Sequence, residues 1–329
     1  MHATALLRRL MIAAGLMWLV VTLTFALLRL APGDAATFLI PPGASADDAA
    51  RVRAELGLDR SMPVQYARWL RGAVSGDLGS SFASGRAVSA VLAEAAPVSL
   101  ALGAMSLALT FLIGVPIGMV QAARHRRPLD RILTAVTTAV YAAPTFWLAL
   151  GFVALFTYGA ATLGLPAWLR LPSFGLRTPG ITDGGWAGLV DLARHALLPV
   201  SLLALVGAAG IARYARTSVL DVLRMDFVKT ARGKGATDST VFVRHVLANV
   251  LPSLIVLFAL SLPGLLAGSI FVESVFAWPG LGRLTLNAIL ARDYPVIMGA
   301  TRWYSGAVIT ANLLAELAMP LLDPRRELA

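Results

Sequence analysis

Six long apolar runs dominate the sequence and restrict the folds that the chain can adopt. A helix needs roughly 20 apolar residues to cross the hydrocarbon core of a bilayer, which is about 30 Å thick. Lipid offers no hydrogen-bond partners, so a segment inside it must satisfy its own backbone groups as a helix. The sequence therefore predicts an all-α integral membrane protein with six transmembrane helices, at about residues 10–28, 98–122, 132–158, 196–212, 250–271 and 298–322. We expect Pro144 to kink the third of them.

Composition supports the membrane prediction and excludes several kinds of site. Only 14% of the residues are charged, against about one-quarter in soluble domains. The chain has no cysteine, which excludes disulfides and cysteine-based metal or redox sites. The four histidines lack the spacing of metal ligands. We predict no metal site and no catalytic residue in this chain.

The first apolar run resembles either a secretory signal peptide or a retained membrane helix. Arg8 and Arg9 precede it, as in a signal peptide. Its apolar stretch is longer than a usual signal core, and no clear small-residue cleavage site follows. We favour the retained helix.

The basic residues predict the orientation of the spans. With the N-terminus inside, the inner segments are residues 1–9, 123–131, 213–249 and 323–329. They hold 15 of the 28 Lys and Arg residues and six of the 18 Asp and Glu residues. Both termini are therefore predicted to be cytoplasmic, in a multi-pass protein of the bacterial inner membrane. Because topology explains the net charge of +10, we expect no nucleic-acid partner.

The outer segments carry their own patterns. Residues 47–56 and 64–74 are amphipathic and predict short helices at the outer surface. Residues 159–195 are rich in Gly, Pro and Trp and predict an irregular loop resting on the outer face. A third segment, 272–297, contains Trp278-Pro279-Gly280, which we expect to form a turn.

The inner stretch 213–249 carries the most specific pattern. Asp226 suits a helix N-cap and Gly235 the position that ends a helix, while Thr237 or Asp238 can cap the next one. This predicts a helix of about two turns that is rigid, exposed and cationic. It is either an ordinary basic loop or an element that inserts into another protein and transmits motion. The small residues Thr230 and Ala231, followed by Gly235, favour insertion, because they allow the close approach of another backbone.

Motifs along nearly the whole chain resemble the permease subunits of bacterial ABC importers, in the branch for oligopeptides, dipeptides and nickel. The inner stretch Lys229-Thr-Ala-Arg-Gly-Lys-Gly235 is similar to that branch's version of the coupling loop, the EAA loop. Further similar motifs, in order, are Leu28-Arg-Leu-Ala-Pro-Gly-Asp34, Leu56-Gly-Leu-Asp-Arg60, Pro63-Val-Gln-Tyr66, Gly76-Asp-Leu-Gly79, Val272-Glu-Ser-Val-Phe-Ala-Trp-Pro-Gly-Leu-Gly-Arg283, Ala291-Arg-Asp-Tyr-Pro295 and Leu322-Asp-Pro-Arg325.

The resemblance implies a type I importer fold and several partners. These are a second, homologous permease, two ATP-binding subunits, and a periplasmic or lipid-anchored solute-binding protein. Residues 1–95 would hold the first helix and an extracytoplasmic segment, and residues 96–329 a five-helix core. The coupling loop would be formed by Asp226, Lys229, Thr230, Ala231, Arg232, Gly235, Arg244 and His245. ATP and Mg²⁺ would bind the ATPase subunits, since nothing here fits the P-loop pattern. We therefore expect no cofactor in this chain and no enzyme activity of its own.

A few residues could line or gate a pathway. An ionisable residue within a span is costly, which points to function or pairing. Glu273 could instead lie at the membrane interface, and Glu316 could share an interhelical hydrogen bond with Asn312. The possible gate or pathway residues are Glu273, Trp278, Pro279, Gly280, Asn312 and Glu316.

The solute and two rival classes remain to be separated. Di- or oligopeptides are the expected cargo, with nickel, glutathione or another small solute as alternatives. A secondary transporter driven by an ion gradient would call for inverted repeats and a charged midplane site, and the sequence shows neither. A membrane-embedded enzyme would need converging His, Asp or Glu residues within the spans, which hold almost none.

Overall fold

The computed structural model describes residues 3–30, 40, 45–55, 57–181, 185–266 and 270–322. The motif residues 31–34, 56 and 323–325 lie outside this part. The described chain is helical, with one isolated β-bridge between Ser80 and Ala87. The chain divides into two compact units. Unit 1 comprises Met1–Ser99 and Pro279–Thr310, and unit 2 comprises Leu100–Trp278 and Ala311–Ala329.

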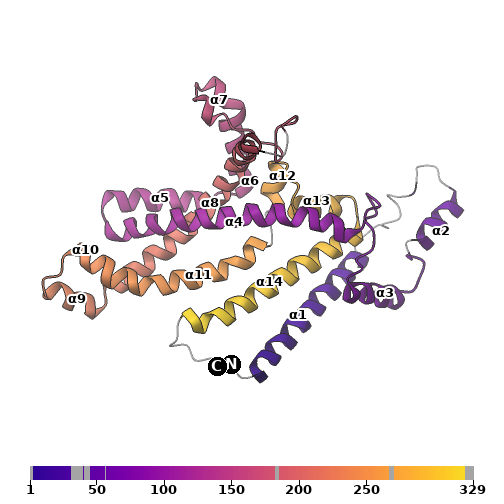
Figure 1. The fold of residues 1–329 in the computed structure, drawn as a ribbon, viewed down its shortest axis with the longest axis horizontal. Helices are drawn as coiled ribbons and strands as arrows, with labels where there is room; N and C mark the ends of the chain where they lie inside the picture. Colours follow the sequence, from indigo (N-terminus) through magenta and orange to yellow (C-terminus); the bar gives the residue numbers. More distant parts are fainter. Residues whose placement is uncertain are drawn as a thin grey trace. The chain divides into compact units, whose positions relative to one another are not determined.

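Unit 1 is built on a long N-terminal helix and short surface helices. It contains α1 (Ala3–Leu30), α2 (Ala46–Glu55), α3 (Met62–Ser75), the start of α4 (Val88–Ala123), α13 (Leu281–Leu290) and the start of α14 (Tyr294–Leu322) (Figure 1). The helices α2 and α3 confirm the two predicted amphipathic segments. Tyr66 and Trp69 of α3 pack against Phe25 of α1, with ring centroids 5.3 and 5.7 Å away. The core gathers apolar residues of α4, α13 and α14, including Val88, Leu92, Leu281, Val296 and Ala300.

A buried carboxylate joins two of the sequence motifs within unit 1. Asp293, from the motif 291–295, is 2% exposed. It accepts hydrogen bonds from the Ser81 hydroxyl at 2.5 Å and from the backbone N–H groups of Phe82 and Ala83 at 3.1 Å. The turn that follows the motif 76–79 is thereby fixed to the start of α14.

Unit 2 contains the inner stretch 213–249 and the helices around it. In chain order they are the rest of α4, α5 (Pro128–Ala142), α6 (Thr145–Val153), the π-helical η2 (Ala154–Tyr158), α7 (Gly159–Thr162), the 3₁₀ turn η3 (Ala167–Leu169), α8 (Gly185–Leu223), α9 (Asp226–Gly233), α10 (Asp238–Thr240), the π-helical η4 (Val241–Leu247), α11 (Ala248–Leu266) and α12 (Ile270–Val275). The end of α14 completes the unit.

Two glycines allow α4 and α8 to approach closely. A Cβ on Gly114 would lie 2.8 Å from the Ala208 carbonyl oxygen, and one on Gly118 would lie 2.4 Å from that of Ala212. The spacing is the small-residue pattern that membrane helices use to pack backbone against backbone. It places the two helices in direct contact along one side of unit 2.

Five described helical segments are long and apolar enough to cross a membrane: Leu7–Leu30, Val88–Ala123, Thr145–Thr162, Gly185–Leu223 and Asp238–Leu262. They overlap the first five predicted spans. The sixth prediction falls within α14, which is 29 residues long and whose side chains from residue 315 onward lie outside the described part.

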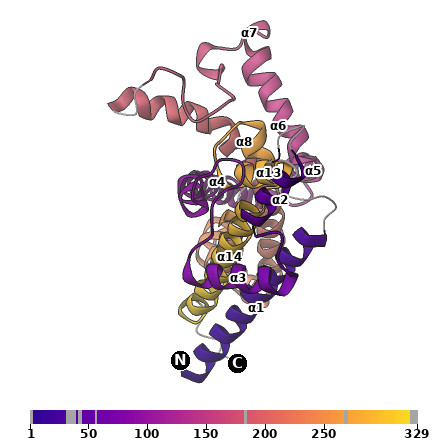
Figure 2. The same cartoon turned by 90° about the vertical axis from the view of Figure 1, so that its right-hand side faces the viewer.

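The prediction of a single helix over residues 132–158, kinked at Pro144, was wrong, because two separate helices form there. The chain breaks after α5, because the ring of Pro144 disfavours helical backbone at Ala143, which adopts an extended conformation (φ −75°, ψ 136°). Beyond this break α6 runs in a different direction from α5 (Figure 1 and Figure 2). The apolar segment of spanning length starts at Thr145.

Candidate functional site

The inner stretch forms a short helix, α9, which lies with α10 at one end of unit 2 (Figure 1). Its start differs from the prediction. Met225, with extended backbone (φ −70°, ψ 149°), occupies the N-cap position, and Asp226 is the first helical residue. The carboxylate of Asp226 still favours the helix, because negative charge is stabilised near an N-terminus. It pairs with Lys229 at 2.8 Å, and this hydrogen bond lowers the pKa of Asp226.

The end of α9 is fixed by a glycine, as predicted. Gly235 has a φ of +84°, a left-handed conformation that other residues rarely adopt. Its N–H donates to the Arg232 carbonyl at 2.9 Å, and the N–H of Ala236 donates to that of Ala231 at 3.1 Å. These two bonds form a Schellman motif, which satisfies the last carbonyls of the helix.

The next helix begins immediately, also as predicted. Thr237 is the N-cap of α10, and its hydroxyl accepts a hydrogen bond from the N–H of Thr240 at 3.3 Å. Arg232 of α9 reaches Asp238 of α10 at 3.4 Å. The connection between α9 and α10 is therefore short and conformationally restricted.

One face of α9 is anchored in a core that other helices of unit 2 build. Val228 is fully buried, and Ala231, one turn later, packs against the same cluster. The cluster combines residues of α4, α8, η4 and α11: Ala122, Ala215, Val219, Val222, Val241, Val246, Val250 and Leu254. The Phe227 ring lies 6.4 Å from the His245 ring of η4. We therefore expect α9 to move together with these neighbours.

The other face of α9 is open. Lys229, Thr230 and Arg232 are exposed. The Thr230 hydroxyl donates to the Asp226 carbonyl at 3.0 Å. Arg244 of η4 is also exposed. The result is a small cationic surface on a fixed support.

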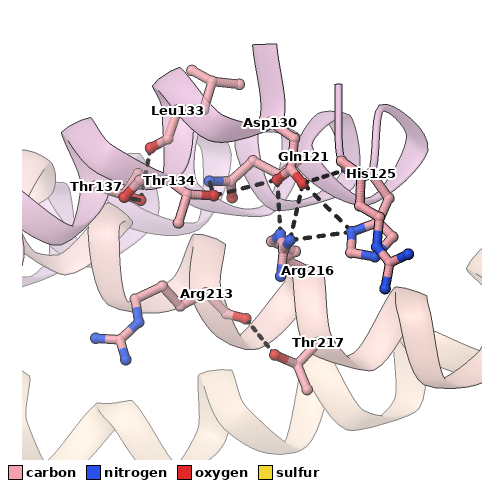
Figure 3. A network of polar contacts seen from close by, with 10 residues as sticks. Gln121, His125, Asp130, Leu133, Thr134, Thr137, Arg213, Arg216 and Thr217 are labelled. Carbon is pink, nitrogen blue, oxygen red and sulfur yellow. Dashed lines mark hydrogen bonds and ion pairs between the residues drawn. The ribbon is translucent and has the colours of Figure 1, made fainter. Parts of the chain in front are cut away.

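A polar network that sequence reasoning missed connects α5 to α8 near this end of the unit (Figure 3). Asp130, 3% exposed, accepts two hydrogen bonds from the Arg216 guanidinium, both at 2.9 Å. The Arg126 N–H donates to it at 2.9 Å, Thr134 donates at 3.3 Å, and His125 lies 3.4 Å away. The hydrogen bonds from Arg216 hold the pKa of the Asp130 carboxyl well below its usual range.

The possible pathway residues are distributed over both units. Glu273 is fully buried in α12, and its carbonyl accepts the N–H of Trp278 at 2.8 Å. Trp278, 2% exposed, ends unit 2, while Pro279 begins unit 1 and Gly280 is the N-cap of α13. Asn312 is exposed on α14, and the Glu316 side chain lies outside the described residues.

Comparison with known proteins decides the family. The sequence matches the family described as "Binding-protein-dependent transport system inner membrane component" over residues 114–328, and the N-terminal part of the same kind of component over residues 3–103. The chain belongs to this family of permeases. It is a multi-pass inner-membrane protein and a permease component of an ABC importer, which favours this class over the secondary transporter and the membrane enzyme.

Similar proteins cover the permease from end to end. A protein of Brucella suis named as a putative peptide permease is 39% identical over 97% of both chains. The oligopeptide transport system permease protein AppB of Bacillus subtilis is 33% identical over 99% of both chains. In an inward-facing structure of the MetNI methionine ABC transporter, one chain is 17% identical with a TM-score of 0.51, over 70% of this chain and 96% of that one. The fold is therefore that of a type I importer permease.

Proposed function

We propose that this permease carries di- or oligopeptides across the inner membrane. The support is that similar proteins over nearly their whole length are named as peptide or oligopeptide permeases. Nickel, glutathione or another small solute would be the cargo if that likeness does not extend to specificity. Uptake of labelled peptides, glutathione and nickel is measured in cells with and without this gene. The solute whose uptake depends on the gene is the cargo.

Energy comes from separate subunits in this proposal. Two ATP-binding subunits bind ATP and Mg²⁺ beneath a pair formed by this permease and a second, homologous one. A solute-binding protein delivers cargo from outside. The chain itself needs no cofactor and hydrolyses nothing. Residues 1–95 wrap around the second permease, and the core of residues 96–329 forms the pathway. The candidate gate residues of this pathway are Glu273, Trp278, Pro279, Gly280, Asn312 and Glu316.

The helix α9 is the coupling element of this machine. The observation that carries the proposal is the combination of a buried inner face at Val228 and an exposed outer face at Lys229, Thr230 and Arg232. An ATPase groove that holds the outer face pushes a helix that is packed onto α8 and α11. Closure of the ATPase pair thus becomes movement of the helices that line the pathway. Arg244 and His245, on η4, flank the same contact.

Cross-linking tests this placement directly. The chain has no native cysteine, so a Thr230→Cys variant carries a single thiol for a photoreactive maleimide. In the assembled importer, we expect light to join Thr230→Cys to an ATP-binding subunit. A Ser84→Cys variant, labelled on the predicted outer side, is the control and should give no such product. Adducts of Thr230→Cys with lipid alone or with the solute-binding protein would refute the coupling role.

A further inference from the structure

The turn between α4 and α5 carries several positive charges that are not balanced by nearby carboxylates in the described part of the chain. Four arginines lie within eight residues there: Arg124, Arg126, Arg127 and Arg131. All four are exposed. Among the described residues, none of these guanidinium groups is paired with a carboxylate. The charge is therefore available to an anion from outside the chain.

The Asp130 carboxylate, which lines a cavity beside this turn, does not neutralise this charge. Both oxygens of Asp130 are occupied by Arg216, by the Arg126 N–H and by Thr134. The backbone bond from Arg126 also fixes the turn, in which Arg126 adopts a positive φ of 65°. Asp130 therefore holds the Arg216 side chain and the backbone of the turn, and its charge is already used by Arg216.

These groups line the end of an open cavity of about 870 Å³. Its polar end is formed by His125, Arg126, Asp130, Arg131 and Arg216. Figure 3 shows Asp130 beside Arg216 and His125. The neighbouring Arg124 and Arg127 are not part of its wall. Two of the four exposed arginines, Arg126 and Arg131, therefore line the cavity.

The rest of the cavity wall consists of small, mostly apolar side chains. It follows one face of α5 for about three turns, away from the cationic end, with Thr134, Ala135, Thr138, Ala139 and Ala142. Small side chains leave room for an extended hydrocarbon chain. An inorganic anion would use the cationic end alone and leave this wall exposed.

We propose that this cavity binds an anionic phospholipid of the cytoplasmic leaflet, with the phosphate at Arg126 and Arg131 and an acyl chain along α5. The predicted topology supports this leaflet, because residues 123–131 are an inner segment by the distribution of basic residues. Basic pockets at the cytoplasmic membrane surface are suited to anionic headgroups. The site is independent of the coupling role of α9, since no residue of α9 takes part.

The test uses the full-length permease in detergent and counts bound lipids by native mass spectrometry. Phosphatidylglycerol is titrated against phosphatidylcholine with the same acyl chains. Arg126→Gln/Arg131→Gln is the test variant, and Arg124→Gln/Arg127→Gln is the control with the same loss of charge in the same turn. Thermal unfolding of both variants checks that the fold persists.

We expect the wild-type protein to prefer phosphatidylglycerol. The test variant should bind it on the order of 30-fold more weakly, since each of the two arginines that line the cavity contributes about fivefold to binding of the headgroup. The control arginines lie outside the cavity wall, so their loss should weaken binding by no more than about threefold. Equal losses in the two variants would show unspecific charge attraction and overturn the proposal. Millimolar inorganic phosphate should not displace the lipid. Binding of phosphate with the same dependence on Arg126 and Arg131, and no advantage for the lipid, would also overturn it.

Discussion

Gly235 sets the geometry at the end of α9 through its backbone rather than through a contact. Its φ of +84° is open to glycine and costs other residues about 1–2 kcal/mol, more for β-branched ones. A Cβ at this position would meet nothing within 4 Å. A substitution therefore acts by bending the connection to α10, without a steric clash.

A Gly235→Val variant is expected to assemble with its partners but to lose the link between ATP hydrolysis and transport. The strained turn would shift α10 relative to α9 while leaving the buried face in place. ATPase activity and peptide uptake in proteoliposomes measure the two halves of the cycle. Gly233→Ala, inside the helix, serves as control and should transport normally. Normal uptake by Gly235→Val would exclude this role for α9.

Asp130 gives a prediction about stability and pH. Its pKa is lowered in the folded protein, so the ionised carboxylate contributes stability above its ordinary value of about 3.9 and loses it as the pH falls below that. Asp130→Asn should cost roughly 3 kcal/mol at pH 7, the low end for a broken buried pair, because Arg216 is 25% exposed. Thermal unfolding of both proteins in detergent should differ clearly at pH 7, and the difference should begin to shrink below about pH 4 and vanish only as the pH falls through the lowered folded pKa. A constant difference across this range would contradict the assignment.

At the scale of elements, α9 depends on its anchoring more than on its own propensity. Eight residues are too few for a stable isolated helix, so tertiary packing must hold it. The caps at Gly235 and Thr237 were predictable because they are local signals within a few residues of each other. The anchoring through Val228 was not, since it depends on residues of four other elements.

Val228→Ala should loosen this anchoring. Removing two buried methyl groups costs about 2 kcal/mol, including the cavity that they leave. We expect faster hydrogen exchange of the α9 amides and weaker coupling of ATP hydrolysis to uptake. Lys229→Ala, on the exposed face, should change stability by no more than about 0.5 kcal/mol. Unchanged exchange in Val228→Ala would mean that α9 is held by something else.

At the scale of the whole molecule, hydrophobic runs predicted the helices well, and paired distant residues escaped prediction. The spans could be found because roughly 20 apolar residues in sequence have one physical solution in lipid. The pair of Asp130 and Arg216 is separated by 86 residues, and that of Ser81 and Asp293 by 212, so no local pattern announces either. The break at Pro144 was underestimated, because a proline can kink a helix or end it, and its neighbours decide which.

The topology predicts which sites each side of the membrane can reach. Single cysteines at Arg124 and Thr230 should react with a membrane-impermeant maleimide only after the cytoplasmic face is opened, and one at Ser84 from the outside in intact spheroplasts. The ion pair between Asp130 and Arg216 supports the shared side of the first two, since it joins both inner segments. Labelling of Arg124→Cys and Thr230→Cys from opposite sides would refute the orientation.

The two faces of α9 have separate evolutionary constraints. Val228 and Ala231 must match the core of this chain, whereas Lys229, Thr230 and Arg232 are exposed and, among the described residues, contact only nearby residues of α9 and α10. Mutations on the outer face can therefore accumulate without a folding penalty. After a gene duplication produces a new ATPase subunit, changes at these three side chains would be enough to adapt the permease to it. Related importers in one cell can in this way come to share an ATPase subunit or to use separate ones.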